Sequence, residues 1–89
     1  MGKGEISWKG RTEEGEKREV YAKHIGNRWY FHVRGKRHDQ WQDLPEPPLE
    51  DWLELLDGVQ RRVNRRLLPP VEEERLKKKI LEVFPDAKL

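Results

Sequence analysis

The stretch VYAKHIGNRWYFHV, residues 20–33, decides the fold. Apolar and polar residues alternate on both sides of Gly26-Asn27, and this alternation predicts two β-strands joined by a two-residue loop. A glycine at the first loop position is typical of a type II′ hairpin turn. With these two residues as the loop, opposed residues share a face, and a slip by one residue would mix the faces. One face then carries Val20, Ala22, His24, Trp29, Phe31 and Val33, and the other carries Glu19, Tyr21, Lys23, Ile25, Arg28, Tyr30, His32 and Arg34.

An earlier strand extends this hairpin into a meander. Residues 5–11 (EISWKGR) pair with residues 17–23 through the polar, glycine-containing loop 12–16. This pairing places Trp8 opposite Val20 and brings opposite charges together on the other face. The sequence also allows a fourth short strand within residues 38–42, but it does not determine the register of that strand.

The second half predicts two helices after the stiff segment Pro45–Pro48. The first helix covers about 19 residues, continues through Gly58 and ends before Pro69-Pro70. Its apolar stripe comprises Leu49, Trp52, Leu53, Leu56, Val59, Val63 and Leu67. The second helix runs from about Val71 to Phe84, where Pro85 ends it, and its stripe comprises Leu76, Ile80, Val83 and Phe84.

The predicted fold class is α+β. A three-stranded, or four-stranded, antiparallel meander (1–44) and a connector (45–48) precede an antiparallel two-helix hairpin (49–89). A small sheet and a helix pair are each marginal alone, so we expect one domain with both helices packed on one sheet face. The expected core comprises Trp8, Val20, Trp29, Phe31, Val33, Trp52, Leu56, Val63, Ile80 and Phe84.

Composition limits the functions that this chain can perform. Its 89 residues include 19 Lys+Arg against 17 Asp+Glu, a net charge of +2, and no cysteine. Disulfides, thiolate catalysis and cysteine-ligated zinc are therefore excluded. No apolar run exceeds three residues, which excludes a transmembrane helix, and no apolar segment follows Lys3 as in a secretory signal. We expect a cytoplasmic protein with no membrane partner.

The sequence favours binding over catalysis. It contains no evident Ser/His/Asp set and no phosphate-cradling glycine loop. The predicted register points His24 and His32 to opposite faces, so they cannot share a metal ion. We therefore expect no enzyme activity, no cofactor, no metal and no small-molecule substrate.

The outer sheet face is the main candidate site. Between Val20 and His38 there are five basic residues and no acidic one, interleaved with aromatic rings. Such a face can stack on bases and neutralise phosphates. The predicted nucleic-acid contacts are Lys23, Arg28, Tyr30, His32, Arg34, Lys36 and Arg37. The alternative is an ordinary solvated face with cross-strand ion pairs, since a dedicated binder usually has a larger charge excess than +2.

Two other features carry separate hypotheses. Trp41, in a polar stretch, either caps the core or, if exposed, anchors a protein contact. The alternative function is accordingly a protein-interaction or structural module, including a homodimer. The cluster Arg61–Arg66 resembles a basic nucleic-acid helix, but it also complements the helix dipole and Glu72–Glu74.

Overall fold

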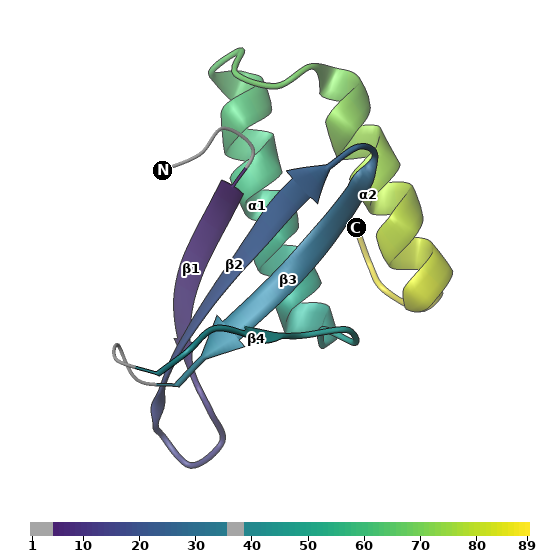
Figure 1. Cartoon of the computed structure of the whole chain (residues 1–89). Helices are drawn as coiled ribbons and strands as arrows, with labels where there is room; N and C mark the ends of the chain where they lie inside the picture. The colour runs from purple at the N-terminus through teal and green to yellow at the C-terminus, as the bar shows by residue number, and fades with distance from the viewer. Residues whose placement is uncertain (1–4, 36–38) are drawn as a thin grey trace. The chain divides into compact units, whose positions relative to one another are not determined.

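The computed structural model describes residues 5–35 and 39–89 (Figure 1). The chain divides into two compact units, Met1–Pro47 and Pro48–Leu89. The first unit holds the strands β1 (Glu5–Arg11), β2 (Lys17–Ile25), β3 (Arg28–Arg34) and β4 (Gln42–Asp43), and the second holds the helices α1 (Leu49–Asn64) and α2 (Pro70–Val83). The predicted α+β class, an antiparallel sheet followed by two helices, is confirmed. Within the described residues, neither helix is long and apolar enough to cross a membrane.

The sheet has the order β1-β2-β3-β4, and its strand pairs are antiparallel. Trp8 pairs with Val20, and Val20 pairs with Val33, which confirms the register predicted from the alternating pattern. Gly26, the first loop residue, has φ +62°. Asn27, the second loop residue, does not have a positive φ, since Arg66 is the only non-glycine residue with one in the described part. A positive φ at the first loop position alone is the pattern of the predicted type II′ turn.

The fourth strand exists but is only two residues long. It pairs His32 with Asp43 and Val33 with Gln42. The Leu44 N–H donates to the Phe31 carbonyl at 2.9 Å and prolongs the contact. The strand therefore begins at the last residue of the predicted span, and His38 lies outside the described residues.

The inner face of the sheet carries the buried apolar residues Ile6, Val20, Ala22 and Phe31. Trp8 packs edge-on against Phe31, with ring centroids 5.9 Å apart. Three predicted core residues of this unit, Trp8, Trp29 and Val33, are half-buried instead. Trp8 lies on an edge strand, and Trp29 lies beside the hairpin turn, where it stacks on His24 at 4.3 Å.

Helix α1 continues through Gly58 as predicted but ends at Asn64, earlier than the stripe indicated. Arg66 adopts the left-handed φ of 61°. The Leu67 N–H then donates to the Arg62 carbonyl (2.8 Å), and the Arg66 N–H donates to the Val63 carbonyl (3.0 Å). These two bonds form a Schellman motif, which terminates the helix. The prediction that Leu67 belongs to the buried stripe is wrong, since it is 66% exposed.

The buried side of α1 is rotated relative to the prediction. Leu53 is exposed, whereas Leu55 is fully buried with Trp52, Leu56 and Val59. In α2, Leu76 and Ile80 are buried as predicted, and Val83 is exposed, contrary to prediction. Two further predicted core residues, Val63 and Phe84, are half-buried.

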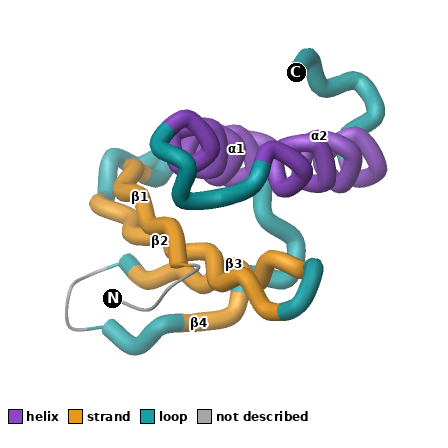
Figure 2. Tube along the Cα trace, turned by 90° about the horizontal axis from the view of Figure 1, so that it is seen from above, coloured by secondary structure: helices purple, strands orange, loops and turns teal. Residues whose placement is uncertain are grey.

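Helix α2 runs back alongside α1 (Figure 2). The Gln60 Nε2 of α1 donates a hydrogen bond to the Glu73 Oε2 of α2 at 3.3 Å. The helical hairpin is therefore confirmed. Packing of this pair on one face of the sheet stays a prediction.

Candidate functional site

The outer sheet face brings together five of the seven predicted nucleic-acid contacts, namely Lys23, Arg28, Tyr30, His32 and Arg34. Lys23 of β2 lies directly opposite Tyr30 of β3, and the other three also belong to β3. Because side chains alternate along each strand, all five share one face. The remaining two, Lys36 and Arg37, lie outside the described residues.

An aromatic cluster, formed by Tyr21, His32 and Trp41, occupies the middle of this face. Tyr21 stacks on His32 with ring centroids 4.6 Å apart, and Trp41 meets Tyr21 edge-on at 4.7 Å. The β3–β4 pairing delivers Trp41 to this position, because Trp41 immediately precedes β4. Trp41 therefore contacts the outer face through Tyr21, on the side opposite Val20 and Ala22.

Arg34 holds Trp41 in place. Its guanidinium carbon lies 4.4 Å from the centroid of the Trp41 ring. Its Nε and Nη2 both donate to Glu19 Oε2, at 3.0 and 2.8 Å. The Arg34 side chain is only 22% exposed. Its charge is therefore compensated by Glu19, and its role on this face is to position the indole ring.

His32 is engaged in a similar way. Its Nδ1 lies 3.1 Å from Asp43 Oδ1, on the strand that carries Trp41 to the sheet. His32 and Arg34 therefore contact other side chains of the outer face and hold the aromatic cluster in position.

The end of the sheet beside the β2–β3 turn has a different character. Lys23, Arg28 and Tyr30 are exposed there, and we call these three residues the open end. No ion pair between described residues engages Lys23 or Arg28. Tyr30 is 45% exposed. The open end thus presents two exposed cations, neither in a close ion pair with a described residue, beside an accessible aromatic ring.

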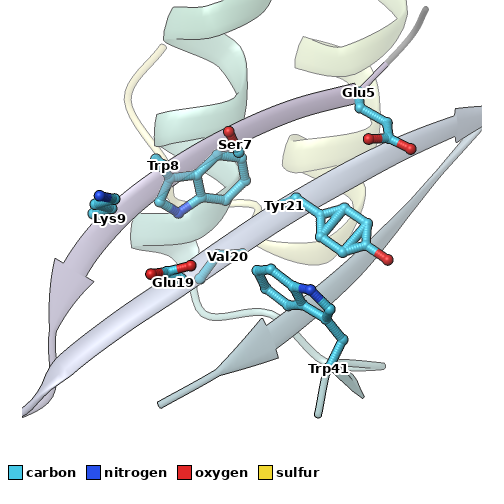
Figure 3. A pocket seen from close by; sticks show the side chains of 8 residues that line it. All are labelled: Glu5, Ser7, Trp8, Lys9, Glu19, Val20, Tyr21 and Trp41. Atoms are coloured by element: carbon cyan, nitrogen blue, oxygen red, sulfur yellow. The ribbon is translucent and has the colours of Figure 1, made fainter. Parts of the chain in front are cut away.

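A hollow of about 480 Å³ lies beside Trp41, over β1 and β2 (Figure 3). It is lined by Glu5, Ser7, Trp8, Lys9, Glu19, Val20, Tyr21 and Trp41. Tyr21 and Trp41 lie next to each other and give it an aromatic wall. Sequence reasoning missed this hollow, because it depends on where β4 brings Trp41.

The hollow combines carboxylates with a lysine, so it lacks the uniform positive charge that a phosphate site requires. Across residues 5–35 and 39–89, no group of three His, Cys, Asp or Glu side chains could hold a metal ion.

Several charges of the helical unit have partners within that unit. Arg61 Nη2 lies 2.9 Å from Asp57 Oδ2, one helical turn earlier. Lys77 Nζ lies 3.1 Å from Glu73 Oε2, and the hydrogen bonds from Lys77 and Gln60 lower the pKa of Glu73. These local pairs favour a structural role for the charges at these positions.

Comparison of the chain with protein-family models, curated proteins and solved structures finds no match. The side chains of the outer sheet face therefore carry the functional argument.

Proposed function

We propose that the open end of the sheet binds single-stranded nucleic acid without catalysing a reaction on it. Tyr30 stacks on one base, while Lys23 and Arg28 contact the flanking phosphates. The observation that carries this proposal is the direct pairing of Lys23 with the exposed Tyr30, next to the exposed Arg28. Aromatic rings flanked by basic side chains are the usual elements of single-strand binding surfaces.

A single strand is favoured over a duplex because of the exposed ring. A base can stack on a protein side chain only when it has left its own stack, as in loops and single strands. Lys36 and Arg37, which follow β3 in the sequence, contribute two further positive charges. Arg34 and His32 act indirectly in this proposal, since both hold the aromatic cluster in place.

Fluorescence anisotropy with labelled single-stranded DNA and RNA oligonucleotides tests the proposal over a series of salt concentrations. Counterion release predicts that affinity falls as salt rises. Loss of one phosphate contact in Lys23→Gln or Arg28→Gln should reduce the salt slope by about 0.7. Lys79→Gln, which removes one exposed lysine from α2, is the matched control and should leave the slope unchanged.

The ring contribution is tested separately with Tyr30→Thr, which keeps a residue of high β propensity in the strand. Loss of one stacking contact should weaken binding by about 1–3 kcal/mol while leaving the salt slope unchanged. Tyr30→Phe keeps the stacking surface and should bind as the parent protein does. Absence of binding at low salt, or an affinity and salt slope that none of these substitutions changes, would reject the proposal.

Protein contact through Trp41 is the second candidate function. Trp41 is 38% exposed, yet its indole contacts Tyr21 and Arg34 beside the hollow. A preorganised, partly exposed tryptophan is a common binding hot spot. If neither DNA nor RNA binds at low salt, this second candidate replaces the first.

A further inference from the structure

Strand β1 forms one edge of the sheet. Its seven residues pair with β2 on one side, and no strand among the described residues pairs with its other side. Alternate residues of an edge strand direct their N–H and C=O groups outward, where a further strand can accept them. The strand contains no proline that would block such pairing. Its backbone is therefore suited to the addition of an extended segment.

The sequence of this strand is complementary to itself when a second copy runs antiparallel. With the twofold axis at Ser7, Glu5 faces the partner's Lys9, and Ile6 faces the partner's Trp8. Each of these pairs occurs twice by symmetry, and Ser7 faces the partner's Ser7. We propose that two copies of this chain associate through their β1 edges in this register, forming one continuous sheet.

The established registers of β1, β2 and β3 extend the complementarity beyond the edge strand. On the outer face, the charges alternate along one row that crosses the interface: Arg34, Glu19, Lys9, the partner's Glu5 and the partner's Lys23. On the inner face, one apolar row is unbroken: Phe31, Ala22, Ile6, the partner's Trp8, the partner's Val20 and the partner's Val33. Opposite charges and apolar side chains directly across from each other stabilise paired strands. This agreement on both faces identifies a second copy as the occupant of the edge.

Other registers give less favourable cross-strand side-chain pairs. A shift by one residue would place the apolar side chains opposite the charged ones. An axis at Trp8 keeps the faces separate and pairs Glu5 with the partner's Arg11. It also places Ile6 opposite the partner's Gly10, so both isoleucines lose their apolar partner. The axis at Ser7 is therefore preferred.

A pair of charge variants tests this register. Glu5→Lys alone sets lysine against the partner's Lys9, and Lys9→Glu alone sets glutamate against the partner's Glu5. We expect the parent protein to dimerise in sedimentation equilibrium across the micromolar range. Each variant alone should raise the dimer dissociation constant by about tenfold, because like charges directly opposite are unfavourable.

An equimolar mixture of the two variants should recover dimerisation, because the lysine introduced at position 5 of one copy would then face the glutamate introduced at position 9 of the other. Within each chain both substitutions worsen the pairing with β2, so improved folding cannot explain the recovery. A monomeric parent protein, or a mixture that behaves like the separate variants, would overturn the proposal.

A cross-link provides a second readout that does not depend on charge. The natural chain contains no cysteine, so Ser7→Cys introduces a single thiol. In the proposed register this thiol faces its own copy, and mild oxidation should give a disulfide-linked dimer. Lys9→Cys, also exposed and on the same face of β1, faces the partner's Glu5 and serves as the control. Equal cross-linking rates for the two variants would overturn the register.

Discussion

Trp41→Ala removes the ring that connects the segment before β4 to the outer sheet face. The indole makes an edge-on contact with Tyr21 at 4.7 Å and lies under the Arg34 guanidinium at 4.4 Å. An edge-to-face aromatic pair contributes about 0.5–1.5 kcal/mol, and a partly exposed cation–π contact about 0.5–1 kcal/mol. The substitution should therefore lower the free energy of unfolding by about 1–2.5 kcal/mol. For a domain of this size, that loss corresponds to a decrease in Tm of about 4–20 °C.

Tyr30→Thr is the matched comparison for this prediction. Tyr30 lies on the same face and is 45% exposed, against 38% for Trp41, but no ring contact between described residues engages it. Its replacement should change the free energy of unfolding by about 0.5 kcal/mol or less, as expected for a surface site. Urea unfolding followed by far-ultraviolet circular dichroism measures both variants without relying on tryptophan fluorescence. Equal stability losses in the two variants would refute the assigned position of Trp41.

Three further predictions concern backbone conformation and pH. Gly26→Ala, at φ +62° with open space around the new methyl group, should lower stability by about 1–2 kcal/mol in thermal unfolding. Gly10→Ala, also in open space but without a left-handed φ, should not lose stability. Arg66→Gly relieves a left-handed φ of 61° and should raise the free energy of unfolding by about 0.5–1 kcal/mol. The neighbouring Arg65→Gly, at φ −88°, removes the same charge and should lower it by about 0.5–1 kcal/mol. Because the hydrogen bonds of a lysine and a glutamine lower the pKa of Glu73, its contribution is present above the unfolded pKa and is lost as pH falls through the folded pKa. Glu73→Gln should therefore reduce the urea midpoint at neutral pH but not in strong acid, and an equal reduction at both would contradict this.

The sheet was predictable because several local patterns required the same register. The alternation around Gly26 aligned β2 with β3, and the charges and apolar residues of β1 then fitted only one pairing with β2. The same register predicted that Glu19 would lie opposite Arg34, and these side chains form an ion pair at 2.8 Å. Alternation with period two therefore determined most of the outer face.

The errors in the helices have identifiable physical causes. Leu55 belongs to the buried stripe of α1 and Leu53 does not, but three- and four-residue spacings can be traced through either of them. The early end of α1 depends on a left-handed arginine, a conformation that sequence patterns normally assign to glycine or asparagine. No periodic pattern could have indicated this end.

The position of Trp41 could not be predicted either. Strand β4 has two polar residues, so neither alternation nor β propensity identifies its register. Only the pairing of Gln42 with Val33 brings the preceding indole to Tyr21 and Arg34. The aromatic cluster and the hollow beside it are therefore products of tertiary structure.

The central claim, that the open end binds single-stranded nucleic acid, is tested most directly by mapping amide chemical shifts during titration with a single-stranded oligonucleotide. We predict that the largest shifts will fall at Lys23, Arg28 and Tyr30, and that added salt will reverse them. Shifts confined to the arginines of α1, or no shifts at low salt, would contradict the claim.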